Sequence, residues 1–294
     1  MERRRWRALW PVAIALLMAA CARVQPASPT ATSRPAAVVA ATSSEERPDL
    51  AAYFDKDGVT GSFVLYDAGA NRYIRYNPGR CSQRFRPGST FEFLSALVAL
   101  DSGVVADPDA PSRWDGTVYP NATWNRDHSL RSAFRDSVGW YDAQVAQRVG
   151  KERLQHAVEA AGYGNRDVSG PLTSFWLDGG LRISQEEQIK FLQRLYQGDL
   201  PFSQRAIDRV KEFAIIEQTE EYTLSGKTGL ATMGEADIGW FVGYVERGGN
   251  VVYFATNTEG PKGDGRVPGS RMRITSNILQ ALGVLPEVCG KCQH

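Results

Sequence analysis

The sequence predicts an α/β fold of the α+β type, with a central antiparallel sheet flanked by helices and joined to an all-helical region. Strand-forming segments lie near both ends of the chain, and segments with helical apolar spacing lie between them. The 294 residues are about what one large α/β domain occupies, and no internal repeat divides them. Strands from the two ends that share one sheet form a single domain, because they bury their apolar faces against the same helices.

The expected strands are rich in β-branched and aromatic residues. Residues 61–67 and 72–76, which are separated by a short turn containing Gly and Asn, form the pattern of a hairpin. Residues 222–226, 239–246 and 250–256 supply the strands of the C-terminal part. The expected sheet therefore combines N-terminal and C-terminal strands.

The expected helices follow from apolar spacing and from capping residues. Residues 91–103 carry apolar side chains at helical spacing and end at Gly103. Ser184 stands three residues before Glu187, which is the pattern of a capping box. Further helices are expected over residues 130–149, 152–161, 184–197 and 274–282.

Charge and composition limit the class of partner. The chain has 34 basic and 33 acidic residues, and this balance gives no electrostatic reason to expect a nucleic acid as partner. Its hydrophobic content of 43% is that of an ordinary folded globular protein.

Residues 1–21 have the composition of a secretory signal peptide. Four arginines occur within the first seven residues, an apolar stretch covers residues 9–20, and small residues precede Cys21. The apolar stretch is shorter than the about 20 residues that a membrane-spanning helix needs. Residues 17–21 resemble a bacterial lipobox, which implies a lipid on Cys21 and an anchor at the extracytoplasmic face of the membrane. Plain cleavage and release is the alternative.

The segments on either side of the expected domain have different compositions. Residues 22–48 are rich in Pro, Ala, Ser and Thr and contain no aromatic residue. Such a segment cannot bury enough apolar surface to offset its ordering entropy, so we expect a disordered tether. The folded domain is then expected over residues 49–285, and a short tail over residues 286–294.

The tail contains two of the cysteines. Together with Cys81, Cys289 and Cys292 make an odd set of three once Cys21 is set aside. With His294 the tail cysteines offer three metal ligands at a chain end, and we expect no metal site and no cofactor. A disordered tail, or a disulfide between one tail cysteine and Cys81, is the favoured interpretation.

Two serines and a strand motif carry the candidate chemistry. Ser89 stands where a loop becomes a helix, so its hydroxyl is exposed and nearby N–H groups are free to stabilise an oxyanion. An ordinary N-cap serine is the alternative. Ser137 opens a later helix, and residues 163–165, Tyr-Gly-Asn, follow a helix end. Residues 227–229, Lys-Thr-Gly, lie on a strand, where they are suited to bind a carboxylate and to let a substrate backbone approach.

In this order the motifs resemble those of the class D β-lactamases, within the serine β-lactamase and transpeptidase-like proteins. That family has S-T-F-K, S-x-V, Y-G-N, a tryptophan eleven residues after the asparagine, and K-T-G. The tryptophan here is Trp176, eleven residues after Asn165. The resemblance covers roughly residues 50–285. It implies a β-lactam-hydrolysing serine enzyme.

The resemblance also implies a role for each motif residue. Ser89 is the nucleophile, and Ser137 relays a proton near the β-lactam nitrogen. The backbone N–H groups of Ser89 and Leu230 form the oxyanion hole. Arg271, twelve residues before Gly283, binds the substrate carboxylate, and a buried structural arginine is the alternative. The other substrate-facing residues are Val138, Lys227, Thr228 and Gly229.

Two positions depart from the family pattern in one pocket. The family's lysine, which carries CO₂ as a carbamate and serves as general base, is replaced by Glu92, and the valine of S-x-V is replaced by Gly139. Glu92 keeps a carboxylate one helical turn from Ser89, but it falls short of a carbamylated lysine by roughly 3–4 Å. Gly139 is expected to leave space for a bridging water, and Trp176 is expected to orient that water or Glu92.

Three functions remain open from the sequence. One is a penicillin hydrolase that works through an acyl-enzyme on Ser89, with Glu92 as a base whose pKa is raised by burial. The second is a lipid-anchored binder of β-lactams or peptidoglycan stem peptides, which acts as a trap or a sensor because the lysine is missing. A peptidoglycan transpeptidase is the third, and it too would need that lysine.

Overall fold

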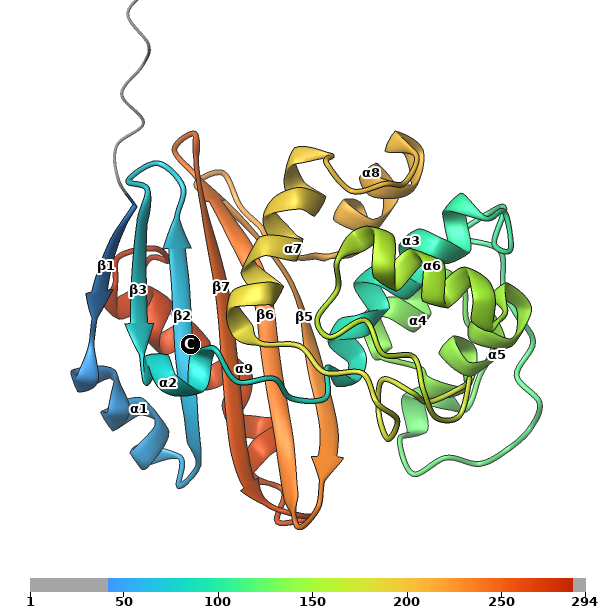
Figure 1. Cartoon of the computed structure of the whole chain (residues 1–294), viewed down its shortest axis with the longest axis horizontal. Helices are drawn as coiled ribbons and strands as arrows, with labels where there is room; N and C mark the ends of the chain where they lie inside the picture. Colours follow the sequence, from blue (N-terminus) through green and yellow to red (C-terminus); the bar gives the residue numbers. More distant parts are fainter. Residues whose placement is uncertain (1–41, 288–294) are drawn as a thin grey trace, which may run out of the picture. The chain divides into compact units, whose positions relative to one another are not determined.

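The computed structural model describes residues 42–287. Its seven strands form one sheet in the order β1-β3-β2-β7-β6-β5-β4 (Figure 1). The expected signal peptide, the expected lipidation site Cys21, and Cys289 and Cys292 lie outside the described residues. The strands are β1 (Ser43–Glu46), β2 (Thr60–Asp67), β3 (Arg72–Tyr76), β4 (Ile215–Gln218), β5 (Tyr222–Met233), β6 (Ala236–Arg247) and β7 (Asn250–Pro261).

The sheet joins the two ends of the domain, as the sequence predicts. The N-terminal strand β2 pairs antiparallel with the C-terminal strand β7, with Val64 opposite Ala255. The hairpin of β2 and β3 also forms, with Leu65 opposite Ile74. The class of fold and the central, mainly antiparallel sheet are therefore confirmed.

The folded part begins earlier than the sequence predicts. Strand β1 lies inside the expected tether and pairs in parallel with β3, with Ser43 opposite Arg72. Arg75 donates a hydrogen bond to Ser44 at 2.7 Å. The boundary at residue 48 is therefore wrong. Strand β1 is short, polar and mostly exposed, so its stability comes from the edge of β3 and not from an apolar pattern of its own.

Helices cover both faces of the sheet. Helix α7 crosses one face and contacts β2 and β7, whereas α9 packs on the other face against β6 and β7 (Figure 1). Helices α3 to α6 form a helical region beside β5 (Figure 1). The helices are α1 (Ala51–Lys56), α2 (Pro78–Cys81), α3 (Glu92–Asp101), α4 (Leu130–Asp136), α5 (Gly139–Val149), α6 (Lys151–Ala161), α7 (Gln185–Gln197), α8 (Gln204–Phe213) and α9 (Arg266–Ala281).

Several helix boundaries differ from the expected ones. The single helix expected over residues 130–149 is divided into α4 and α5, because Ser137 adopts a left-handed conformation (φ 50°, ψ 56°). Helix α9 begins at Arg266 and so includes Arg271. The capping box of α7 is confirmed, since the N–H of Ser184 donates to Glu187 Oε2 at 2.9 Å and the N–H of Glu187 donates to Ser184 Oγ at 3.2 Å.

Cys81 is fully buried at the end of α2. Its thiol approaches the carbonyl oxygens of Tyr76 at 3.3 Å and Phe63 at 3.5 Å. Burial raises the pKa of the thiol to about 12, so the unreactive protonated form prevails at neutral pH. The disulfide to the tail stays a prediction. Within residues 42–287, no helix has both the length and the apolar character needed to cross a bilayer.

Candidate active site

Ser89 lies in the turn Gly88–Phe91, directly ahead of α3, and is half-buried. This turn packs against the backbone of β5. A Cβ atom on Gly88 would lie 2.6 Å from the carbonyl oxygen of Leu230, and one on Gly229 would lie 2.6 Å from the carbonyl oxygen of Pro87. Glycine at both positions therefore lets the serine turn and the Lys-Thr-Gly strand touch through their backbones.

Lys227 contacts both Glu92, which lies one turn after Ser89, and Ser137. Its Nζ lies 3.1 Å from Glu92 Oε2, and both side chains are nearly inaccessible, at 4% and 3% exposure. The same Nζ makes a short hydrogen bond to Ser137 Oγ. The structure thus brings Lys227, Glu92 and Ser137 together from β5, from α3 and from the break between α4 and α5.

The backbone of Ser137 explains how its hydroxyl reaches Lys227. Its left-handed conformation is uncommon for a residue other than glycine and costs on the order of 1–2 kcal/mol. The turn is held because the N–H of Ser137 donates to the carbonyl of Ala133 and that of Val138 does the same. Backbone strain of this kind persists where the surrounding structure fixes it, often in active sites.

Asp142 is a member of the cluster that the motifs do not reveal. It lies in the first turn of α5 with 5% exposure. Burial raises the pKa of Asp142 well above its usual range, and the neighbouring charge of Glu92 raises it further. In sequence, an acidic residue in the first turn of an amphipathic helix is typical of a solvated helix end, so no local signal distinguishes it.

Glu92 and Asp142 are neighbouring buried carboxyl groups, and each affects the pKa of the other. Burial raises the pKa of Glu92, but the Lys227 ammonium and the Ser89 hydroxyl oppose this shift. The two neighbouring carboxyl groups also act on each other, since Asp142 lowers the pKa of Glu92 and Glu92 raises that of Asp142. At neutral pH we therefore expect an ionised Glu92 paired with Lys227, beside an Asp142 whose raised pKa favours its protonated form.

Replacement of Asp142 by asparagine tests this assignment through stability. Asp142 has a folded-state pKa above its ordinary value of 3.8, so its contribution to stability is complete below pH 3.8 and is lost as the pH rises toward the folded-state pKa. The asparagine side chain cannot ionise but keeps a donor. We expect D142N to gain stability relative to the natural protein between pH 4 and pH 7, by about 1.4 kcal/mol for each unit of the shift.

Chemical denaturation at several pH values measures the difference. D142A serves as the matched control, because it lacks the donor and should be destabilised at pH 4 as well. A D142N difference that stays constant with pH would show that Asp142 is ionised in the folded protein.

The comparisons with known proteins bear directly on this arrangement. The chain matches the family model described as penicillin binding protein transpeptidase domain over residues 37–280. It belongs to this family. It is 40% identical over 242 residues to β-lactamase OXA-48 of Klebsiella pneumoniae, covering 82% of this chain and 91% of that protein. It is 39% identical over 245 residues to regulatory protein BlaR1 of Bacillus licheniformis, covering 83% of this chain but 40% of that protein.

Solved structures agree with the assignment to the penicillin-binding transpeptidase family. A class D β-lactamase, YbXI from Nostoc, has a TM-score of 0.77 at 41% identity, covering 81% of this chain and all of that one. The C-terminal domain of the Bacillus licheniformis BlaR penicillin-receptor has a TM-score of 0.79 at 36% identity, covering 83% of this chain and 98% of that one. The expected class D-like fold is thereby confirmed.

Gly139 lies against the ring of Trp124. A Cβ atom at this position would lie 3.0 and 3.2 Å from two atoms of the Trp124 ring. The indole of Trp124 is held by a 3.2 Å hydrogen bond from its Nε1 to the carbonyl of Asp136. Trp124 therefore narrows the space at the position of the family's valine, whereas the bridging water stays a prediction.

Trp176 packs against the serine turn ahead of α3. Its indole is 3% exposed and stacks on Phe91 with ring centroids 5.3 Å apart. Its carbonyl accepts a 3.1 Å hydrogen bond from the N–H of Gly88. Trp176 therefore contacts Gly88 and Phe91, the residues on either side of Ser89 and Thr90. The expected orientation of Glu92 by Trp176 stays a prediction.

The other expected substrate residues differ in their exposure. Val138 is completely buried in the hydrophobic core, so its assignment as a substrate-contacting side chain is wrong. Thr228 is half-buried beside Lys227. Arg271 donates a 2.6 Å hydrogen bond to the carbonyl of Gly229, and burial lowers its pKa to about 10. Arg271 thus braces the Lys-Thr-Gly strand, and its carboxylate-binding role stays a prediction.

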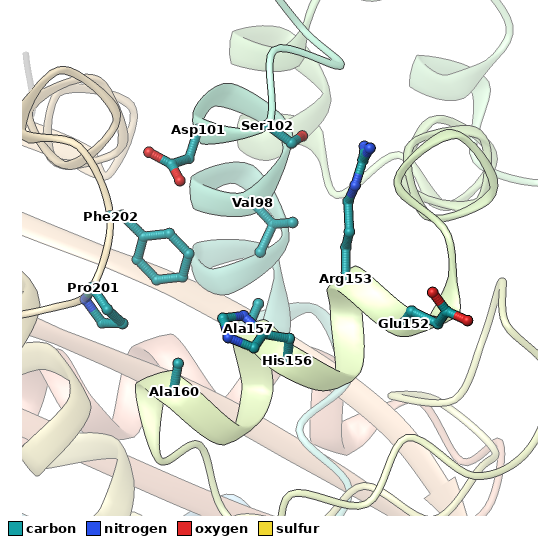
Figure 2. A pocket seen from close by; sticks show the side chains of 10 residues that line it. All are labelled: Val98, Asp101, Ser102, Glu152, Arg153, His156, Ala157, Ala160, Pro201 and Phe202. Atoms are coloured by element: carbon teal, nitrogen blue, oxygen red, sulfur yellow. The ribbon is translucent and has the colours of Figure 1, made fainter.

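A separate cavity lies between α3 and α6. It has a volume of about 320 Å³, and its lining includes Val98, His156 and Phe202 (Figure 2). None of the motif residues lines it. The cavity is therefore distinct from the candidate active site, which is formed by buried polar contacts at the edge of β5.

Proposed function

We propose that the protein is a class D β-lactamase-like serine hydrolase that forms an acyl-enzyme on Ser89 and releases it slowly. The observation that supports this most is the buried contact of Lys227 with both Glu92 and Ser137 next to the Ser89 turn. The relatives named as a β-lactamase and as a penicillin-receptor also favour β-lactams as ligands. Their names favour an extracytoplasmic location, with Cys21 as the proposed lipid anchor.

Acylation requires the Ser89 proton to reach the lactam nitrogen. Glu92 takes the hydroxyl proton as Ser89 Oγ bonds to the lactam carbonyl carbon. The carbon–nitrogen bond then breaks, and the nitrogen takes a proton from Ser137. Lys227 returns a proton to Ser137 and receives one from Glu92, so each relay group ends in its starting state.

The oxyanion would lie at the open edge of β5. Strand β4 pairs with β5 only as far as Ser225, and the N–H of Gly226 donates to the carbonyl of Ala214 at 2.8 Å. Peptide groups alternate along a strand, so the N–H of Leu230 faces the same edge as that of Gly226. There it lies beside the Ser89 turn, and the two N–H groups of Ser89 and Leu230 form the proposed oxyanion hole.

Deacylation is the step that Glu92 serves poorly. A strained lactam supplies driving force for acylation, whereas hydrolysis of the ester needs a water that is positioned and deprotonated. Burial raises the pKa of Glu92, but the ion pair with Lys227 stabilises its charged form and so opposes this gain in base strength. The Trp124 ring also narrows the space beside Gly139, which leaves less room for a bridging water.

A binding role is the second candidate function. The match to regulatory protein BlaR1 favours it, because a receptor needs a lasting adduct and not turnover, but the chain spans 40% of that protein. In this role the protein would be a lipid-anchored trap or sensor domain for β-lactams or peptidoglycan stem peptides. The persistence of the adduct separates the two functions.

Intact-mass measurement over time after addition of benzylpenicillin tests the proposal. We expect the protein to gain the mass of one penicillin and to lose it over a period much longer than its formation. Loss as fast as formation would show that Glu92 is a competent deacylation base. A permanent adduct would favour the binding role, and no adduct would contradict both.

A further inference from the structure

An apolar hollow lies next to the buried lysine. It has a volume of about 240 Å³, and Lys227 and Thr228 form part of its lining. Four large hydrophobic side chains within residues 42–287 are exposed, and three of them, Ile215, Ile216 and Met272, line this hollow at 40%, 45% and 40% exposure. We name these three residues the apolar shelf. Single exposed apolar residues are ordinary on a protein surface, but a cluster at one opening indicates a binding surface.

The fold explains why the shelf stays uncovered. Strand β4 carries Ile215 and Ile216 and separates from β5 beyond Ser225. Gly226 follows on β5, and a Cβ atom there would lie 3.4 Å from Ile216 Cδ1. The same Cβ atom would lie 2.8 Å from the carbonyl oxygen of Val242, so the close packing of the backbone here requires glycine in the lining of the hollow.

The walls of the hollow continue the apolar character of the shelf. Phe134 of α4 and Phe213 of α8 contact each other with ring centroids 6.3 Å apart, and both line the hollow. Lys227 Nζ lies 5.6 Å from the centre of the Phe134 ring. Arg135 is the other charged lining residue. A ligand group in this space would meet aromatic and aliphatic surface within a few ångströms of the lysine.

We propose that the apolar shelf binds an apolar substituent carried by the ligand on the same side as its carboxylate. The inference rests on the proposed function, since it takes Ser89 as the attachment point and Lys227 and Thr228 as the groups that face the carboxylate. Met272 directly follows Arg271, so the shelf adjoins that proposed carboxylate arginine too. Pockets that bind whole drug-sized ligands have volumes of about 300–1,000 Å³. The 240 Å³ hollow therefore accommodates one substituent, such as an aryl or branched alkyl group.

Two cephalosporins with the same acylamino side chain provide the probes. One carries a styryl group and the other a methyl group at ring position 3, next to the carbon that bears the carboxylate. Acylation rates at Ser89 are measured by intact mass for the natural protein and for a variant with I216N and M272Q. Both replaced side chains are partly exposed, so the fold should tolerate the change.

We expect the variant to lose about tenfold in acylation rate with the styryl compound, the order of effect that one lost apolar contact produces. The methyl compound should change by less than about twofold, because it does not reach the shelf. V118N is the matched control, since Val118 is the fourth exposed hydrophobic side chain, at 78% exposure, and does not line the hollow.

Equal losses with both compounds, or no loss with either, would overturn the role of the shelf while leaving acylation at Ser89 intact. A natural protein that is acylated by neither compound would overturn the proposed function, and the inference with it. A loss in V118N as large as that in the shelf variant would show that general surface polarity, and not the shelf, controls the rate.

Discussion

Replacement of Ser89 by alanine is expected to abolish the penicillin adduct completely. Ser89 is half-buried in the turn ahead of α3, and its hydroxyl lowers the pKa of Glu92. No other group in the proposed mechanism bonds to the lactam carbonyl. Intact mass after incubation with benzylpenicillin should therefore show the added mass in the natural protein and none in S89A.

The control for this experiment is another serine that is accessible. Ser82 is exposed and follows α2, away from the motif residues, so S82A should be labelled like the natural protein. Thermal unfolding of S89A should resemble that of the natural protein, because removing a half-buried hydroxyl has a small effect on stability. An adduct that forms on folded S89A would mean that a different nucleophile carries the chemistry.

Replacement of Glu92 by lysine should convert a slow release of the acyl group into a fast one. A lysine at this position can add CO₂ to form a carbamate, which reaches further than Glu92 by roughly 3–4 Å. A well-placed general base contributes about 10²–10⁴-fold, so the adduct of E92K should decay faster by a factor within that range. The gain should depend on added bicarbonate, whereas bicarbonate should leave the natural protein unchanged.

The structure favours this single replacement over a double one with G139V. A valine Cβ would lie 3.0 Å from the Trp124 ring, so the added side chain would displace that indole. E92Q is the matched control, because it has the shape of Glu92 but cannot act as a base, and its acylation should slow. If E92K releases penicillin no faster than the natural protein, deacylation is limited by something other than the base at position 92.

Local sequence was sufficient to predict the framework of this protein. Segments rich in β-branched and aromatic residues identified strands at both ends of the chain, and the pairing of β2 with β7 confirms the shared sheet. Ser184 and Glu187 predicted the start of α7, because a capping box depends on residues only three positions apart. The order of short motifs around Ser89, Ser137 and Lys227 was likewise visible without a structure.

Elements whose stability depends on distant partners were missed. Strand β1 is polar and gains its hydrogen bonds from β3, so its own residues carry no strand pattern. Ser137 was expected at a helix start, but its left-handed conformation, which separates α4 from α5, is fixed by the packing around it and has no local signal. Such features depend on long-range pairing, which local propensity does not encode.

The chemistry of the pocket was also decided by tertiary structure. The sequence by itself showed that Glu92 and Gly139 replace the family's lysine and valine. Only the fold placed Asp142 against Glu92 and the Trp124 ring against Gly139. The pKa of a carboxyl group depends on its burial and on charges within a few ångströms, and neither quantity follows from its place along the chain. The sequence by itself therefore identified the motif residues of the site, whereas packing added Asp142 and determined the protonation of the buried groups and the space around them.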